Sequence, residues 1–389
     1  MNFHGCPISG DHYIPFTCVD FSGLPAVEHR AAIELAVNEL HLSLNLSKGP
    51  LLRVVLFNPG VHRPQRLLVT VHHMVSDALS LPILLEDLQM AYKQIGQGEQ
   101  IQLPPKTTSV KQWAERLDTY AQSAELHQEL DYWLTLPWAQ VPPLPLDYPV
   151  GEDYISASNR SLTTSLSVEE TNVLLRKVPR VYSTQVEDTL LMALVQALSR
   201  WTGSRWVAVR MVDSGRSNVI LDTEDIDLSR TIGCLVQHRL LMLEWEEASN
   251  PGDVLRSIRN QLRCIPNRGF GYYLLLHCSE DAEAANKLRA FPLDLRRVEL
   301  NYLGQQPTQV YSESAVFRRA REHTGEVSDP RNPHYNLLDC GVLVVGGRLS
   351  ARWSYSKAVH KRTTIQQVAN DFIEALRTLI TECQSETLS

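Results

Sequence analysis

The sequence predicts a mixed α/β protein built in two similar halves. Short apolar runs typical of buried strands alternate along the chain with longer segments in which apolar residues recur at helical spacing. A proline-rich stretch near the middle separates one such series from the next. With 389 residues, 43% of them hydrophobic, the chain is long enough to form two or more cores of ordinary domain size.

The first half is predicted to contain helices and strands in alternation. A helix at 26–42 precedes strands at 51–57 and 66–71, and the polar segment before this helix offers no strand pattern. The motif HHMVSDALS follows the second strand and leads into another helix, which ends near Gly96. Five apolar residues fall on one stripe of this helix: Leu84, Leu88, Ala91, Tyr92 and Ile95. A further long helix is expected at 110–134.

A dense group of prolines marks the predicted boundary between the halves. Five prolines occur within thirteen residues, too many for a helix or a central strand: Pro137, Pro142, Pro143, Pro145 and Pro149. The predicted division is therefore an N-terminal subdomain at 1–136, a linker at 137–150 and a C-terminal subdomain at 151–389.

The second half repeats the alternation. A helix is predicted to start at Ser167, a favoured N-cap, because Glu169 and Glu170 follow in its first turn. Two more helices are expected at 186–201 and 365–381. The expected strands are 160–166, 206–212, 231–245, 296–302, 337–345 and 348–355.

Composition and charge argue against several classes of function. The net charge of −7 would on average repel the backbone of a nucleic acid. Seven scattered cysteines form neither a CxxC pair nor a zinc-ligand spacing, a pattern typical of thiols in a reducing cytosol. No apolar run approaches the roughly 20 residues of a membrane span, and the first residues do not resemble an export signal. We expect a cytoplasmic protein that binds no metal, membrane or nucleic acid.

The adjacent histidines His72 and His73, followed by Asp77, form the most distinctive local feature. Neighbouring side chains at a strand end point in opposite directions, so only one imidazole can face a given cavity. The residues alone leave two interpretations open. In the first, one histidine is a structural residue hydrogen-bonded in the core, and Asp77 caps the next helix. In the second, a histidine acts as an acid–base group near neutral pH.

A specific resemblance favours the second interpretation. The segment VTVHHMVSDALSLPILLEDL (69–88) resembles the HHxxxDG signature of the condensation and epimerization superfamily of nonribosomal peptide synthetases. Five later segments resemble blocks of the epimerization branch, in the order that branch has them. They are DTLLMA (188–193), DIDLSRTIG (225–233), IPNRGFGYYLL (265–275), LNYLGQ (300–305) and RWSYSKAVHKRTTI (352–365).

The resemblance implies a fold, a site and a substrate. The fold would be two chloramphenicol-acetyltransferase-like subdomains in a V-shaped pseudodimer with a central tunnel. His73 would be the catalytic histidine, and His72 and Asp77 would support its loop. A carrier protein or an adjacent synthetase module would deliver a thioester on its 4′-phosphopantetheine, and the domain itself would bind no cofactor. Four residues would line the tunnel: Val212, Asp213, Arg216 and Tyr302.

The chain also departs from the pattern it resembles. Val212 stands where epimerization domains carry a glutamate that moves a proton, and Asp213 could replace it only if a β-bulge turned it to the same face. Cys234 begins the block that in the family reads WFT, and Ala78 replaces the glycine of HHxxxDG. The family's opening block has no counterpart before Pro15. We therefore expect an altered pocket and an N-terminally truncated first subdomain.

These observations leave three functions to distinguish. The first is epimerization at the α-carbon of a carrier-bound aminoacyl or peptidyl thioester. The second is condensation, in which the same histidine assists formation of an amide or ester bond by acyl transfer; loss of the glutamate at Val212 favours it. The third is a degenerate, non-catalytic domain that docks a carrier protein.

Overall fold

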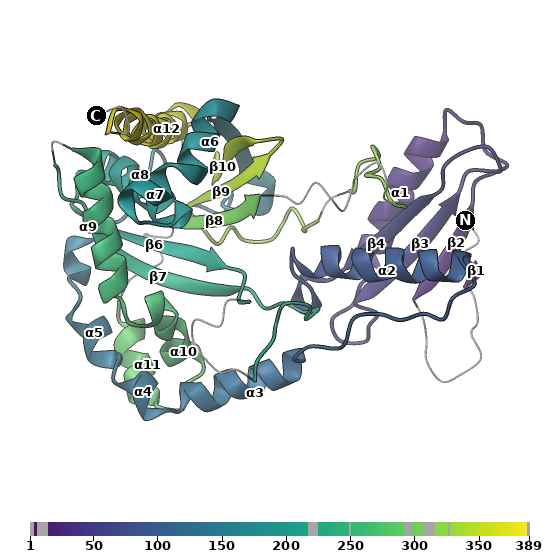
Figure 1. Ribbon diagram of the computed structural model, residues 1–389, viewed down its shortest axis with the longest axis horizontal. Coiled ribbons are helices and arrows are strands. Elements are labelled where there is room, and N and C mark those ends of the chain that lie inside the picture. Colours follow the sequence, from purple (N-terminus) through teal and green to yellow (C-terminus); the bar gives the residue numbers. More distant parts are fainter. Residues whose placement is uncertain are drawn as a thin grey trace. The chain divides into compact units, whose positions relative to one another are not determined.

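The computed structural model describes residues 4–5, 15–216, 225–248, 250–291, 298–305, 316–325 and 327–386, and these form two compact units of mixed α/β structure (Figure 1). Neither unit is a continuous stretch of chain. The first combines Met1–Val110, Asp227–Leu235 and Thr308–Asp329. The second combines Lys111–Ile226, Val236–Pro307 and Pro330–Ser389.

The first unit is a four-stranded sheet in the order β1-β2-β3-β4. Its strands are β1 (His4–Gly5), β2 (Phe16–Asp20), β3 (Leu52–Asn58) and β4 (Arg66–Val71). Strands β2 and β3 run parallel, joined by helix α1 (His29–Leu42), and β4 pairs antiparallel with β3. In the core, the rings of Phe21 and Phe57 stack with centroids 5.6 Å apart, and Ala36 and Val37 of α1 are buried with them.

One expectation for the first unit is wrong. The segment before the first helix does contain a strand, β2, which the pattern did not reveal because Val19 is its one buried residue. Helix α2 (Ser80–Gly96) forms as predicted, and its apolar stripe is partly exposed. Tyr92 and Ile95 are 63% and 62% exposed, and among its residues Ser80 and Ile83 are buried. Spacing alone predicts the helix but does not identify the face it buries.

The second unit is built on a six-stranded sheet in the order β5-β10-β9-β8-β6-β7. The strands are β5 (Asn159–Ser165), β6 (Trp206–Asp213), β7 (Gln237–Glu244), β8 (Val298–Gln305), β9 (Leu338–Val345) and β10 (Arg348–Ser356). The central pairs β6–β8 and β8–β9 are parallel, and the outer pairs are antiparallel.

The second unit contains the predicted helices α6 (Val168–Arg176), α8 (Val186–Thr202) and α12 (Arg362–Glu386) together with others that the sequence did not predict in this form. The others are α3 (Val110–Ala121), α4 (Ala124–His127), α5 (Leu130–Thr135), α7 (Val178–Tyr182), α9 (Pro251–Cys264), α10 (Gly271–His277) and α11 (Ala282–Arg289). Ser167 caps α6 in a reciprocal capping box with Glu170. The single helix expected at 110–134 is instead broken into α3, α4 and α5.

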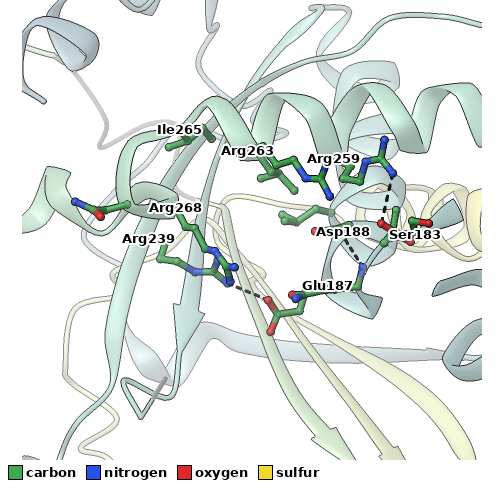
Figure 2. Close-up of a pocket in the computed structure, with 13 residues that line it drawn as sticks. Ser183, Glu187, Asp188, Arg239, Arg259, Arg263, Ile265 and Arg268 are labelled. Carbon is green, nitrogen blue, oxygen red and sulfur yellow. Dashed lines mark hydrogen bonds and ion pairs between the residues drawn. The ribbon is translucent and has the colours of Figure 1, made fainter. Parts of the chain in front are cut away.

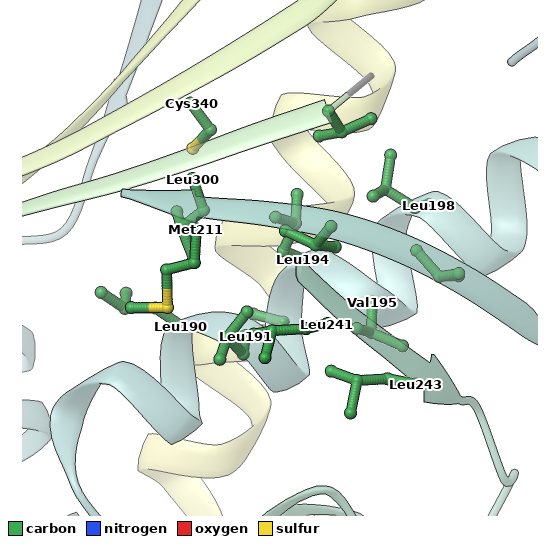
Figure 3. Close-up of a cluster of buried hydrophobic side chains, with 14 of the residues drawn as sticks. Leu190, Leu191, Leu194, Val195, Leu198, Met211, Leu241, Leu243, Leu300 and Cys340 are labelled. Carbon is green, nitrogen blue, oxygen red and sulfur yellow. The ribbon is translucent and has the colours of Figure 1, made fainter. Parts of the chain in front are cut away.

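The main core packs helix α8 against the sheet. Leu190, Leu191 and Leu194 on this helix are buried in one cluster with side chains of the sheet, including Met211 on β6 and Leu300 on β8 (Figure 3). Burying a leucine stabilises a fold by roughly 1.5–3 kcal/mol, so each of these three side chains contributes on that order to the hydrophobic stabilisation of the unit. The helix ends at Gly203, whose φ of 69° suits glycine.

The proline-rich stretch lies within the second unit. Trp138, Val141 and Leu144 from this segment are buried in the main core. The compact units are thus divided elsewhere, near Val110 and on either side of 227–235. The division into subdomains at 1–136 and 151–389, with a linker at 137–150, remains a prediction.

Candidate active site

The histidine pair lies where β4 ends in the first unit. His72 is extended, and its Nδ1 accepts a hydrogen bond from the backbone N–H of Met74 at 3.2 Å. The next three residues form a 3₁₀ turn, His73–Val75, and the side chain of His73 is exposed. His72 therefore takes part in the turn, while His73 is accessible to a ligand.

Asp77 organises the loop from a buried position. One carboxylate oxygen accepts hydrogen bonds from the backbone N–H groups of Leu79 and Ser80, at 3.1 and 2.9 Å, and thereby caps helix α2. The other accepts from the backbone N–H of Leu235 at 3.2 Å. The same aspartate thus fixes the start of α2 and holds a segment from a distant part of the sequence.

Ser80 makes a second connection to that segment. Its hydroxyl lies 3.0 Å from both the N–H and the carbonyl oxygen of Gly233. Because Gly233 and Leu235 are both held, Cys234 between them has a defined position. Its sulfur lies 3.7 Å from Nδ1 of His73. The sequence showed Cys234 as a departure from the family pattern, but its place beside His73 depends on the fold.

The segment 227–235 is held to the rest of the first unit at further points. The guanidinium of Arg230 forms ion pairs with Glu86 and Asp87 on α2, at 3.1 and 2.5 Å. The hydroxyl of Thr231 donates to the carbonyl of Thr108 at 2.6 Å. The predicted strand at 231–245 is therefore shorter, because its first residues belong to the first unit and β7 starts at Gln237.

Val212 and Asp213, at the end of β6 in the second unit, lie on opposite faces of the sheet. The register between β6 and β7 is unbroken from Trp206 to Asp213, so no bulge turns Asp213 toward the face of Val212. Asp213 instead lies 3.7 Å from the guanidinium of Arg239. A carboxylate therefore does not replace the missing glutamate on the Val212 face by this route.

Polar groups surround Val212 on its own face. His238 is its cross-strand partner on β7 and Asn301 its partner on β8. The nearby pair of Arg210 and Glu299 is joined at 2.5 Å. Burial, together with the charge of Arg210, lowers the pKa of His238. This face therefore presents an imidazole and an ion pair around an aliphatic side chain.

The remaining two predicted site residues also belong to the second unit. Tyr302 on β8 is half-buried, and burial together with the charge of Glu187 raises the pKa of its hydroxyl. Arg216 follows β6, and its guanidinium donates to the carbonyl of Ser214 at 3.4 Å. The structure places His72, His73 and Asp77 in one unit and the other four predicted residues in the second.

The second unit contains a pocket of about 760 Å³ that the sequence did not reveal. Its lining includes the N-terminus of α8 and four arginines from β7, α9 and the loop after α9 (Figure 2): Arg239, Arg259, Arg263 and Arg268. Positive charge exceeds negative charge here, because Glu187 and Asp188 are the acidic residues in the lining. Arg259, Arg263 and Arg268 lie close together in sequence, but they match no binding motif, and their proximity to Arg239 on β7 depends on the fold.

The two acidic groups of this pocket are already engaged. Glu187 pairs with the buried Arg239 at 3.1 Å, and Asp188 accepts from the backbone N–H of Gln185 at 2.8 Å. Within the described part of the chain, the exposed guanidiniums of Arg263 and Arg268 have no carboxylate partner. Together with the N-terminus of α8, they give the pocket the chemistry of an anion site.

Two further properties concern the described residues as a whole. They contain no cluster of three or more His, Cys, Asp or Glu side chains that could hold a metal ion. None of their helices combines the length and the apolar character required to cross a membrane.

Comparison with known proteins identifies the family. The model of the condensation domain family matches residues 8–388. The chain belongs to this family. The crystal structure of the epimerization domain from the third module of tyrocidine synthetase B superposes with a TM-score of 0.81 at 30% identity, covering 95% of this chain and 80% of that one. The first condensation domain of the calcium-dependent antibiotic synthetase, 18% identical with a TM-score of 0.63, shares the fold.

The curated relatives are much longer proteins. A linear gramicidin synthase of Brevibacillus parabrevis is 38% identical over 96% of this chain, which spans 5% of that protein. Tyrocidine synthase 1 of the same organism is 31% identical over 98% of this chain, which spans 34% of its length. The structural matches confirm the predicted fold class, mixed α/β with two chloramphenicol-acetyltransferase-like subdomains.

Proposed function

We propose that this condensation-family domain acts in nonribosomal peptide synthesis and interconverts the L and D configurations at the α-carbon of a carrier-bound aminoacyl or peptidyl thioester. The observation that carries the proposal is the loop at the end of β4. It presents His73 to solvent, while the side chains of His72 and Asp77 are engaged in hydrogen bonds to the backbone. The similarity to an epimerization domain of tyrocidine synthetase B supports the same reaction.

The reaction requires a base that takes the α-proton and a proton source on the opposite face. The thioester carbonyl acidifies the α-carbon, and removal of the proton gives an enolate. An imidazole with an ordinary pKa near 6.5 can accept a proton and return it close to neutral pH. His73 has the accessibility that this role requires. Protonation of the enolate from the other face then inverts the centre.

We assign the substrate to the phosphopantetheine arm of a peptidyl carrier protein, either a separate protein or part of an adjacent module. The great length of the synthases that this chain matches supports this assignment. The domain itself is proposed to hold no metal or organic cofactor. A cytoplasmic location is proposed as well, supported by the scattered cysteines, which resemble those of proteins in a reducing compartment.

Condensation is the second candidate function, and the geometry of β6 favours it. Val212 is aliphatic and Asp213 points to the other face, so the carboxylate expected of an epimerase is missing from this strand position. Acyl transfer to an amine or alcohol uses the histidine loop without that carboxylate. The choice between the two reactions therefore depends on whether another group supplies the second proton.

One experiment distinguishes these functions. A carrier protein loaded with an L-aminoacyl phosphopantetheine is incubated with the domain in deuterated water, with and without a free amine acceptor. We expect deuterium at the α-carbon and loss of optical purity, both abolished in His73→Ala and retained in His62→Ala, an exposed histidine of the same unit. Product that forms only with the acceptor would instead support condensation. Carrier binding without either reaction would support a docking role.

A further inference from the structure

Cys234 and His73 form a thiol–imidazole pair in the first unit. The sulfur lies 3.7 Å from the ring nitrogen Nδ1, within hydrogen-bonding distance for a thiol. His73 is exposed and Cys234 is partly exposed, so a substrate can reach both groups from solvent. A nucleophile beside a base that can accept its proton is the geometry of covalent acyl transfer.

The surrounding hydrogen bonds fix the thiol in this position. Leu235, which follows Cys234, is bound through its N–H to Asp77, and Gly233, which precedes it, is bound to Ser80. Both anchoring side chains are buried, Asp77 at 5% and Ser80 at 1% exposed. The backbone on either side of the sulfur is therefore held, and the pair does not depend on a freely moving loop.

The HHxxxD loop contributes to both members of the pair. Asp77 caps α2 immediately after the turn that carries His73, and its second oxygen holds the residue next to the thiol. One buried carboxylate therefore joins the segment that follows the His73 turn to the segment that carries the sulfur, 161 residues away from the imidazole in sequence.

We propose that Cys234 and His73 act as a nucleophile and its base, which together transfer an acyl group from a thioester onto the sulfur of Cys234. This proposal rests on the proposed function for the class of substrate, a pantetheine thioester. It adds a covalent intermediate that neither epimerization nor direct condensation contains.

The step is balanced without any further reactant. His73 Nδ1 takes the proton of the Cys234 thiol, and the thiolate attacks the thioester carbonyl. The bond from carbon to the pantetheine sulfur breaks, and the departing thiolate takes the proton from the imidazolium. One thioester is exchanged for another, so acyl-Cys234 forms with release of a free pantetheine thiol. An amine or water could then accept the acyl group.

Other thiols of the chain provide an internal comparison. Cys18, Cys264 and Cys278 are exposed, yet among the described residues no imidazole lies within hydrogen-bonding distance of their sulfurs. If exposure alone determined reactivity, these thiols would react at least as fast as Cys234. If the neighbouring base matters, Cys234 should react first.

The first test uses S-acetylpantetheine and the whole chain. After incubation, intact-mass measurement and peptide mapping are expected to show a single acetyl group on Cys234. The adduct should be lost in Cys234→Ala and retained in the matched control Cys278→Ala. We expect His73→Gln to slow its formation on the order of 10²-fold, the size of a general-base contribution. Acetylation spread equally over the exposed cysteines would overturn the proposal.

A second measurement tests the pair even if the acyl group is lost too rapidly to detect or a variant misfolds. Iodoacetamide alkylates thiols irreversibly, and the rate at each cysteine can be read from its peptide. Cys234 is expected to react faster than the exposed Cys264 in the wild type and to lose this advantage in His73→Gln. If the two cysteines react at equal rates in the folded wild-type protein, His73 does not activate Cys234 and the proposal is wrong.

Failure of this proposal can be distinguished from failure of the proposed function. If deuterium exchange at the α-carbon persists in Cys234→Ala and neither measurement shows a reactive Cys234, the pair is wrong and the epimerization proposal stands. If Cys234 is acylated but no exchange occurs, the epimerization proposal fails and the covalent route remains.

Discussion

The carboxylate of Asp77 accepts a hydrogen bond from the backbone N–H of Leu235, 158 residues further along the chain, at 3.2 Å. Asp77 also holds two N–H groups of α2, so replacing it with alanine leaves several buried donors without an acceptor. Each buried donor that loses its acceptor costs about 1–3 kcal/mol. We expect Asp77→Ala to lower the free energy of unfolding by roughly 3 kcal/mol or more.

Urea denaturation followed by fluorescence measures this loss, with Asp87→Ala on α2 as the control. Asp87 is only partly buried and pairs with Arg230 at the surface, where an ion pair contributes about 0–1 kcal/mol. The two substitutions should therefore differ clearly. A loss at Asp77 no larger than that at Asp87 would show that the buried carboxylate is not an anchor.

Asp339 on β9 should make stability depend on pH. Burial and the nearby charge of Glu299 raise its pKa to about 6, although Asn336 donates to it at 2.6 Å. Because the folded state binds this proton more tightly than the unfolded chain, the stabilisation is fully present below about pH 4. It is then lost as the pH rises through about 6.

Asp339→Asn removes this titration, so we expect it to stabilise the protein by about 2–3 kcal/mol at pH 7.5 and to have little effect at pH 4. Unfolding curves collected from pH 4 to 8 measure the difference. Glu280→Gln, at an exposed carboxylate of the same unit, serves as the control and should leave the pH profile unchanged. A wild-type profile that stays flat across pH 4–6 would contradict the raised pKa.

Gly269, in the segment that resembles a family block, is required for steric reasons. Its φ is +92°, and a Cβ at this position would lie 2.4 Å from the carbonyl oxygen of Leu240 on β7. We expect Gly269→Ala to destabilise the second unit by roughly 3 kcal/mol or more, because a rigid backbone atom would have to move. Gly98→Ala is the matched control, since Gly98 has φ +74° but open space around it. There the cost should be about 1 kcal/mol, and thermal unfolding compares the two.

The arginine-lined pocket predicts an effect of anions on stability. Inorganic pyrophosphate should raise the midpoint of thermal unfolding, because binding to the folded state alone stabilises it. The shift should be largely lost when Arg263 and Arg268 are both replaced by glutamine. Arg256→Gln on the same helix α9 is the control, since Arg256 lies outside the pocket lining. An equal shift in all three proteins would indicate a general salt effect.

Local patterns predicted the elements that bury a continuous face. Apolar runs or stripes in the sequence coincide with helix α8, strand β6 and helix α12 and indicate directly which residues are buried. The polar helices α9 and α11 were missed, because their buried residues are few and are stabilised by packing rather than by propensity. The histidine loop was found because its signature residues are close together in the sequence.

Contacts between distant segments could not be predicted in the same way. The assignment of 227–235 to the first unit depends on Arg230, Thr231 and the anchors at Asp77 and Ser80, which are dispersed in sequence. For the same reason the proximity of Cys234 to His73 left no local signal. Periodicity describes one element at a time, whereas a site combines several.

A substitution at Val212 tests most directly whether the missing carboxylate at this position limits the proposed epimerization. The cross-strand neighbour of Val212 is His238, and the ion pair of Arg210 and Glu299 lies on the same face. A glutamate introduced at this position would find an imidazole beside it and would supply a second group able to move a proton. We expect Val212→Glu to increase deuterium exchange at the α-carbon by on the order of 10²-fold.

Val212→Gln is the matched control, because it has nearly the same shape as glutamate but cannot transfer a proton. It should leave the exchange rate at the wild-type level in the same assay. If glutamate and glutamine have equal effects, the gain comes from polarity or packing and not from acid–base chemistry. If neither changes the rate while both variants stay folded, the missing glutamate is not what limits the reaction, and the other departures, at Ala78 and Cys234, become the cause to test.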